Sequence, residues 1–366
     1  MISTSKDYLF RPPHHAIKSS QLAAILLLAI AACPMLWGQA VAYGEQPTSS
    51  AAVPDPTPFP TPPNPKGLQV QMVEDALALD IHHAGINVDL TRLFETRGTR
   101  GSTEFQWKDQ QYSINERYAQ GLDSQIKPLS DAGVVVYLIL LAYPSGDAEK
   151  NSLMLHADAD PDRAYTIAGF NTANQAGTDR FQALVAFLAK RYSEADSPHG
   201  RAWGWIIGNE VNSQFRWYNV GPKSVEAFAS EYERAVRAAH EAVRTYSAHG
   251  RCYLSFDHHW NIAAEGQDKQ KAYPTRAVLE AFAAIARQRG DFEWHVAHHP
   301  YPENLRDPRS WLDKTALPRD DSPRVTFKNL EVATRFMRRP EMLWQGARRR
   351  IILSEQGTDV LRGPDG

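Results

Sequence analysis

The sequence contains little cysteine: two residues in a chain of 366. One of them, Cys33, lies in an apolar segment near the N-terminus, so a chain processed beyond that point keeps Cys252 alone. An intramolecular disulfide is then impossible, and a domain of this length must be held together by its hydrophobic core. Cys252 begins the apolar stretch Cys252–Phe256, which predicts a small buried side chain.

A strong excess of positive charge is also absent. Lys and Arg number 40 against 42 Asp and Glu, the formal net charge is −2, and the pI is about 6.7. Nucleic-acid binding depends on many Lys and Arg contacts to phosphate, so no nucleic-acid partner is expected. The arginines between Arg335 and Arg350 suggest an anionic partner, but they flank a predicted helix end and strand start, and we interpret them as a solvated surface.

No apolar run reaches the roughly 20 residues that a membrane-spanning helix needs. The apolar run Leu22–Cys33 is shorter, follows basic residues and precedes a small-x-small sequence that ends at Ala42. This arrangement predicts a signal peptide over residues 1–42 and therefore a secreted, periplasmic or cell-surface protein, with no stable membrane span after processing. Lipid attachment at Cys33 is an alternative that the sequence leaves open.

Proline is concentrated in the segment Ser49–Lys66, which contains seven of these residues. Such a composition favours extended, polyproline-like chain and offers little to bury in a core. We therefore predict a disordered linker over residues 43–66 and a folded domain over residues 67–366.

Helical and strand-like patterns alternate beyond Gly67. Six apolar segments are typical of strands: 82–90, 133–143, 202–208, 252–260, 292–301 and 349–357. A helical pattern precedes each of them: 72–80, 114–129, 179–192, 224–243, 276–287 and 327–336. The alternation predicts an α/β fold with a parallel sheet, namely a (β/α)8 TIM barrel. No convincing strand precedes Met72 and none follows the last segment, so we expect an incomplete barrel whose first and last strands are missing or poorly defined.

Glu210 and Glu355 each follow a buried strand, and parallel α/β folds build their sites at the carboxyl ends of strands. Retaining hydrolysis of a glycosidic bond needs two carboxyl groups roughly 5–5.5 Å apart, one as acid/base and one as nucleophile. Two barrel strands can hold carboxylates at that distance, so these glutamates are the predicted catalytic pair. The neutral Asn209 beside Glu210 can bind a sugar hydroxyl without lowering the proton affinity of the acid.

Three short motifs in this order resemble the clan A glycoside hydrolases: Gly208–Glu210, His299–Tyr301 and Ser354–Glu355. This (β/α)8 superfamily contains cellulases, mannanases and β-galactosidases, and the resemblance is closest to an uncharacterised bacterial branch of it. It covers about Gly67 to Asp359 and is carried mainly by "GNEVN" and "ILSEQG". The resemblance implies the following roles: Glu210 as acid/base, Asn209 as a sugar contact, Glu355 as nucleophile, Tyr301 as its hydrogen-bond donor, and His299 beside it in the cleft.

One departure from the family pattern lies at the end of the second strand, where family members commonly carry an arginine that keeps the nucleophile ionised. This chain has Asn87–Leu90 there, and Arg92 is the nearest guanidinium. Either Arg92 reaches the site or other groups tune it.

Other aromatic and polar residues near strand ends are candidates for sugar binding, because aromatic faces stack on sugar rings and imidazoles bind hydroxyls. They are His258 and Trp260 after the fifth strand, Tyr143 after the third, and Trp217 shortly after Glu210.

Histidine doublets begin at positions 14, 82, 258 and 298 and raise the question of a metal. Adjacent residues of a strand point to opposite faces, and no HxH, HExxH or Cys/His cluster is present, so no metal is expected. Neither GxGxxG, P-loop nor GxSxG patterns occur, and no cofactor is expected. The expected function is a retaining glycoside hydrolase that cleaves a poly- or oligosaccharide by double displacement. A carbohydrate-binding barrel without turnover and a metal-dependent hydrolase remain as alternatives.

Overall fold

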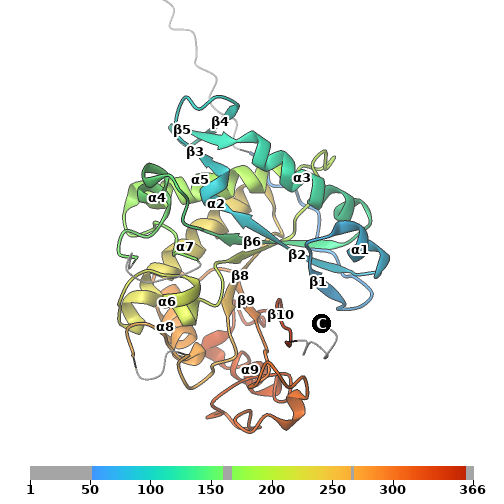
Figure 1. Cartoon of the computed structure of the whole chain (residues 1–366), viewed down its shortest axis with the longest axis vertical. Helices are drawn as coiled ribbons and strands as arrows, with labels where there is room; N and C mark the ends of the chain where they lie inside the picture. Colours follow the sequence, from blue (N-terminus) through green and yellow to red (C-terminus); the bar gives the residue numbers. More distant parts are fainter. Residues whose placement is uncertain (1–51, 160–166, 265–267, 360–366) are drawn as a thin grey trace, which may run out of the picture. The chain divides into compact units, whose positions relative to one another are not determined.

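Seven parallel strands form the main sheet of the computed structural model, in the order β1-β2-β6-β7-β8-β9-β10 (Figure 1). Their bounds are Gly67–Gln69, His83–Asp89, Val135–Leu141, Gly204–Ile207, Arg251–Phe256, Trp294–His298 and Ile351–Leu353. The structure describes residues 52–159, 167–264 and 268–359, which belong to one unit of the chain. Within these residues no ladder joins β10 back to β1, so the sheet curls into an open barrel.

A helix precedes every strand of this sheet after β1. These helices are α1 (Val73–Ala78), α3 (Glu116–Asp131), α5 (Gln175–Arg191), α7 (Val225–Tyr246), α8 (Thr275–Gln288) and α9 (Glu331–Phe336). Three further short helices follow strands: α2 (Leu90–Leu93), α4 (Ala148–Met154) and α6 (Gln214–Trp217). The predicted incomplete (β/α) barrel is confirmed, and all six predicted strands are present.

Strand β6 shows why its sequence is apolar without interruption. All seven residues from Val135 to Leu141 are buried. Val136 and its alternate neighbours pack into the large core shared with the helices, whereas Tyr137 and its alternates pack into a second apolar cluster on the other face of the sheet. A strand buried on both faces has no position that tolerates a polar side chain.

The first strand is short, which explains why the sequence pattern gave little sign of it. β1 contains three residues, all exposed, and pairs Gly67 with His83 and Gln69 with Gly85 of β2. With so few residues and no burial, neither periodicity nor composition marks the segment as a strand.

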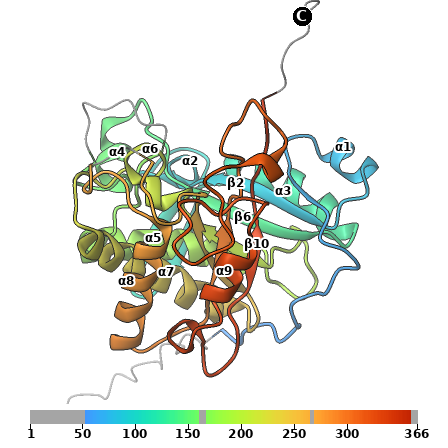
Figure 2. The ribbon, with the colours of Figure 1, turned by 90° about the horizontal axis from the view of Figure 1, so that it is seen from below.

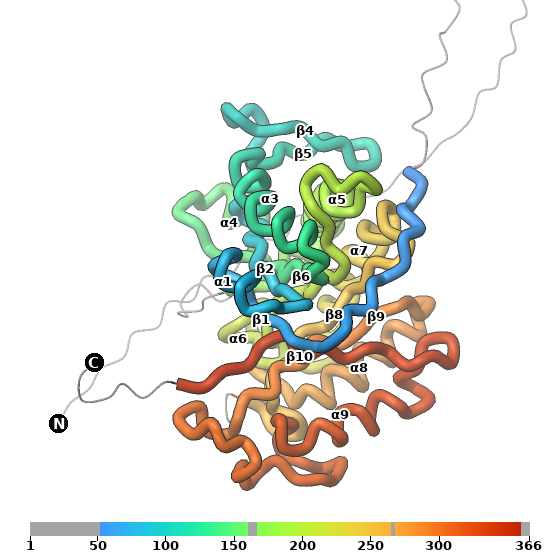
Figure 3. Tube along the Cα trace, turned by 90° about the vertical axis from the view of Figure 1, so that its right-hand side faces the viewer, coloured from blue at the N-terminus to red at the C-terminus, as the bar shows by residue number. Residues whose placement is uncertain are grey.

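The prediction of a disordered linker is wrong for residues 52–66, which lie against the domain. Asp55 pairs with Arg201 at 2.5 Å, and the guanidinium of Arg251 lies 3.7 Å from the centre of the Phe59 ring. Figure 3 shows this blue segment passing β8 on its way to β1. Proline-rich chain can pack when single residues between the prolines find partners, here one carboxylate and one aromatic ring. Residues 43–51 and the predicted signal peptide lie outside the described part of the chain.

A small antiparallel sheet was missed by the sequence patterns. It consists of β3 (Phe94–Glu95), β4 (Ser102–Trp107) and β5 (Gln110–Asn115) in the order β3-β5-β4. Only one of the six residues of β4 is buried, so its sequence resembles a polar loop. Among the described residues, no helix is both long and apolar enough to span a bilayer.

Candidate active site

Glu210 lies just beyond β7 in an unusual backbone conformation. Its φ and ψ angles are 41° and 49°, in the left-handed region that residues other than glycine seldom adopt. Its backbone N–H donates to Oγ of Ser255 at 3.0 Å, and its carbonyl accepts from Ser213 N–H at 2.8 Å. These two bonds hold the residue at the carboxyl end of the sheet and stabilise the strained conformation.

Glu355 lies two residues beyond β10 and contacts the loop that follows β9. The hydroxyl of Tyr301 donates to Oε1 of Glu355 at 2.6 Å. The Glu355 side chain is 28% exposed and that of Glu210 is 12% exposed, so solvent reaches both carboxyl groups. Strands β7 and β10, far apart in the sequence, thus present a glutamate at the same edge of the sheet.

His299 joins the two glutamates. Its Nδ1 lies 3.0 Å from Oε1 of Glu210 and 3.8 Å from Oε2 of Glu355. Since both oxygens contact the same nitrogen at 3.0 and 3.8 Å, they are at most about 7 Å apart, a range that includes the roughly 5–5.5 Å of retaining glycosidases. The sequence-predicted residues Glu210, Glu355, His299 and Tyr301 therefore form one cluster.

The surroundings shift the pKa values of three side chains in this cluster. Burial raises the pKa of Glu210 above its ordinary value, and the hydrogen bond from His299 offsets only part of this effect. Burial alone lowers the pKa of His299, but the hydrogen bond to Glu210 and the charges of both glutamates raise it overall. Burial and the bond to Glu355 raise the pKa of Tyr301, so its hydroxyl stays protonated and remains a donor. The cluster retains protons that isolated side chains would lose.

A second layer of polar residues supports Glu210 and was not predicted. Asp257, buried beyond β8, accepts hydrogen bonds from Nδ2 of Asn212 at 2.6 Å and from the hydroxyl of Ser213. His259 Nδ1 lies 2.9 Å from its second oxygen. Burial alone would raise the pKa of Asp257, but the contacts with His259 and Ser213 hold it well below its usual range. The fixed negative charge further raises the pKa of Glu210. The sequence signal was "DHHW", which marks a polar strand end but not which side chains point inward.

Arg92 does not reach the glutamates. The residue is exposed, and its guanidinium lies over the Tyr118 ring at 4.9 Å from the centroid. Asp89 at the end of β2 instead accepts from the backbone N–H groups of Thr91 and Arg92 and caps α2. The sequence left open whether Arg92 or other groups contact the predicted nucleophile. The structure favours other groups, and those in contact with Glu355 are His299 and Tyr301.

Four other predicted sugar contacts differ in their surroundings. Tyr143 and Trp217 are half-buried against the apolar cluster on the inner face of the sheet. Asn209 is half-buried and makes no side-chain hydrogen bond within the described chain. His258 is half-buried, its ring lies 4.3 Å from that of His259, and burial lowers its pKa to about 3, so it is a neutral imidazole.

The prediction for Trp260 is wrong. Its side chain is only 2% exposed and packs edge-on against Phe336 of α9 at 5.2 Å. The backbone N–H of Trp260 donates to the carbonyl of Pro323, which holds the residue under the loop before α9. An indole in this position is part of the core and has no face available for a sugar ring.

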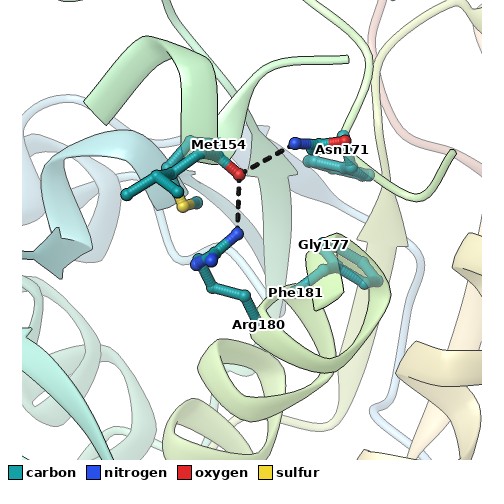
Figure 4. A pocket seen from close by; sticks show the side chains of 7 residues that line it. Met154, Asn171, Gly177, Arg180 and Phe181 are labelled. Atoms are coloured by element: carbon teal, nitrogen blue, oxygen red, sulfur yellow. Dashed lines mark hydrogen bonds between the residues drawn. The ribbon is translucent and has the colours of Figure 1, made fainter. Parts of the chain in front are cut away.

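A small cavity elsewhere is unsuited to a substrate. It lies between α4 and α5 and has a volume of about 10 Å³, space for about one water molecule. Figure 4 shows Arg180 and Asn171 pointing to one carbonyl oxygen. Both side chains donate to the carbonyl of Leu153, at 3.0 and 3.1 Å. No group of three or more His, Cys, Asp or Glu residues within the described ranges is arranged to hold a metal ion.

Comparison with solved structures finds partial similarity to glycosidases. For a β-glucosidase from Pyrococcus furiosus the TM-score is 0.45 at 16% identity, and the match covers 78% of this chain and 66% of that one. For a family 1 β-glucosidase and an endoglucanase, both from Thermotoga maritima, the TM-scores are 0.39 and 0.36 at 14% and 13% identity. Each of these matches covers 63% of this chain, and 53% and 52% of the respective structures. The chain thus spans less than two thirds of the length of each of these three.

No curated protein matches the sequence. A protein family described as "Family of unknown function (DUF5722)" matches residues 58–364. This range includes the strands of the main sheet and both glutamates. The chain belongs to the DUF5722 family.

Proposed function

We propose that this protein is a retaining glycoside hydrolase that cleaves O-glycosidic bonds of a poly- or oligosaccharide. The observation that carries the proposal is the position of His299 Nδ1, within 4 Å of oxygens from both Glu210 and Glu355. Two carboxyl groups at the carboxyl edge of one parallel sheet, at most about 7 Å apart, suit double displacement at an anomeric carbon.

The surroundings of the glutamates support different roles for them. Burial raises the pKa of Glu210, which favours the protonated form that a general acid needs. Glu355 is more exposed, and the hydrogen bond from Tyr301 orients its carboxyl group for attack on an anomeric carbon. We therefore assign Glu210 as acid/base and Glu355 as nucleophile.

In the first step, a carboxylate oxygen of Glu355 bonds to the anomeric carbon while the bond to the leaving oxygen breaks. Glu210 transfers its proton to that oxygen, and the first product leaves as an alcohol. The sugar is then held as an ester of Glu355, and Glu210 carries a negative charge.

In the second step, Glu210 accepts a proton from water as the water oxygen bonds to the anomeric carbon. The ester bond breaks, and Glu355 leaves as a carboxylate. His299, hydrogen-bonded to Glu210, stabilises the negative charge that Glu210 carries between the steps. Asn209, Tyr143, Trp217 and His258 are the side chains that we assign to the sugar rings.

Hydrolysis of a panel of aryl glycosides tests the proposal, with the anomer of the first product identified by NMR. We expect retention of configuration and a loss on the order of 10³-fold or more for Glu355→Gln. Glu210→Gln should lose far more activity on poor leaving groups than on dinitrophenyl glycosides, which need no general acid. Asp359→Asn, which removes an exposed carboxylate nearby, is the matched control and should keep full activity. Inversion of configuration would contradict double displacement.

The exposed position of Arg92 favours one other candidate, a barrel that binds carbohydrate without cleaving it. In the clan A glycoside hydrolases, which this chain resembles, an arginine at the end of the second strand commonly supports the nucleophile. A binding protein of this kind would show the same negligible rate for the wild type and Glu355→Gln, together with measurable affinity for a glycan.

We also propose that residues 1–42 are a signal peptide and that the protein acts outside the cytoplasm. Mass spectrometry of protein recovered from an expressing bacterium tests this directly. A mature N-terminus at Tyr43 supports secretion, a lipid-modified Cys33 supports surface attachment, and an intact N-terminus on cytoplasmic protein contradicts both.

A further inference from the structure

A groove of about 590 Å³ lies between α9 and the start of β10, which are neighbours in Figure 2. This volume is typical of small-molecule sites, which measure roughly 300–1,000 Å³. The residues that line it are Thr334, Met337, Arg338, Ala347, Arg348, Arg349, Arg350 and Ile351. Half of them are arginines, so the groove has a strongly basic lining.

Three arginines in and beside the groove already have acidic partners. Arg335 and Arg339 both pair with Asp320, at 3.1 and 3.0 Å. Arg349 is buried, pairs with Asp291 at 2.6 Å and stacks on a tryptophan of β9. These three side chains serve the fold.

The other three arginines of the groove have no such role. Arg338, Arg348 and Arg350 are exposed, and none of them forms an ion pair with a residue that the structure describes. Like charges gathered at one groove repel each other, and an anion bound there replaces this repulsion with attraction. The sequence-based interpretation of this region as a solvated surface did not foresee that these three arginines line one groove.

We propose that the groove binds an acidic glycan, that is, a sugar chain bearing carboxylate or sulfate groups. The planar guanidinium group matches both anions through paired hydrogen bonds. The hydroxyl of Thr334 can bind a sugar hydroxyl, and the half-buried Ile351 offers an apolar surface to the C–H face of a sugar ring. Only the glycan nature of the ligand rests on the proposed function; the anion preference follows from the arginines themselves.

Two other polyanionic partners fit less well. A nucleic acid would use aromatic side chains for base stacking, and none lines the groove. An anionic membrane is flat and would meet a protruding basic surface more readily than a concave one. A flexible chain with spaced charges fits a groove of this size.

The groove lies at the opposite end of β10 from the glutamates. Arg350 precedes the strand and Glu355 follows it, so at roughly 3.3 Å per residue the two are separated by on the order of 15 Å. This distance corresponds to a few sugar units. A polymer held in the groove would raise the effective concentration of its own chain near the glutamates.

Binding to the full chain tests the proposal. Three proteins are compared: wild type, the groove variant Arg338→Gln/Arg348→Gln/Arg350→Gln, and the matched triple variant Arg97→Gln/Arg100→Gln/Arg117→Gln. Each is titrated with a polyuronate oligosaccharide, a sulfated oligosaccharide, a neutral oligosaccharide and polyglutamate. The arginines of the matched variant are also exposed and remove the same charge elsewhere on the domain. Each protein also carries Glu355→Gln, so that cleavage does not deplete the ligand.

We expect the protein with the unaltered groove to bind at least one acidic oligosaccharide. The groove variant should lose about tenfold or more in affinity for it, whereas the matched variant should lose little. Preference between the two acidic ligands identifies the anion. Equal losses in both variants, or binding of polyglutamate as tight as that of the acidic sugar, would overturn the proposal. Because no turnover is measured, this result is independent of whether the protein hydrolyses aryl glycosides.

Discussion

The hydroxyl of Tyr301 donates a 2.6 Å hydrogen bond to Oε1 of Glu355, linking the loop after β9 to the end of β10. Hydrogen bonds to charged groups are worth about 1.5–3 kcal/mol, and this one orients a carboxylate that must attack along one direction. The contact connects two motifs that are 54 residues apart in the sequence.

Tyr301→Phe removes only this hydroxyl. We expect kcat/KM for an aryl glycoside to fall by roughly tenfold to a hundredfold, because the nucleophile loses its donor. The unfolding temperature should change little, since the ring remains. Tyr112→Phe, which removes a hydroxyl bonded only to Gln110 on the hairpin, is the control and should leave the rate unchanged. An unaltered rate in Tyr301→Phe would argue against Glu355 as nucleophile.

His299→Asn should change the pH dependence of activity. A general acid works only while protonated, so the rate falls as the pH rises through the pKa of Glu210. The hydrogen bond from His299 lowers that pKa, and its removal should raise it and shift the basic limb to higher pH. The pH profile of kcat/KM measures the effect, with the exposed His249→Asn as control. A shift to lower pH would contradict the assigned role of Glu210.

Gly208→Ala tests the turn that presents Glu210. Gly208 has φ of 80°, and an added Cβ would lie 2.8 Å from Cδ2 of the buried Tyr218. We expect a loss of about 1–3 kcal/mol in stability together with reduced activity. Gly98→Ala is a matched control, because its φ is 85° but its Cβ would meet nothing within 4 Å. If both variants lose the same stability, crowding at Tyr218 contributes nothing.

Phe59→Ala tests whether the proline-rich segment belongs to the folded domain. The ring packs edge-on against Trp203 at 5.7 Å and under Arg251, so its loss should reduce the free energy of unfolding by about 1–2 kcal/mol. Chemical denaturation provides the measurement. Val53→Ala, at a side chain that is 88% exposed, should have no effect. Equal stability of Phe59→Ala and wild type would restore the interpretation of this segment as a linker.

The main sheet could be predicted because its strands carry their own signal. Val135–Leu141 is apolar at every position since both of its faces are buried, and no loop has that composition. β1 and β4 could not be predicted, because β1 is short and exposed, and β4, although it forms a hairpin with β5, buries only one of its six residues. The linker prediction failed for a related reason. Composition describes the average of a segment, whereas the contacts with the domain are made by two single residues, Asp55 and Phe59.

For the site, position after a buried strand was enough to select Glu210 and Glu355, because such residues lie at the edge of the sheet, and the resemblance to clan A glycoside hydrolases added His299 and Tyr301. Which of these polar ends face one another depends on the curl of the sheet, and that is a property of the whole packed domain. Folding therefore brought His299 between the glutamates, buried Trp260 under a loop, and left Arg92 on the surface. A residue's type and local pattern predict that it lies at a strand end; its neighbours there are set by contacts between distant segments, which no local pattern encodes.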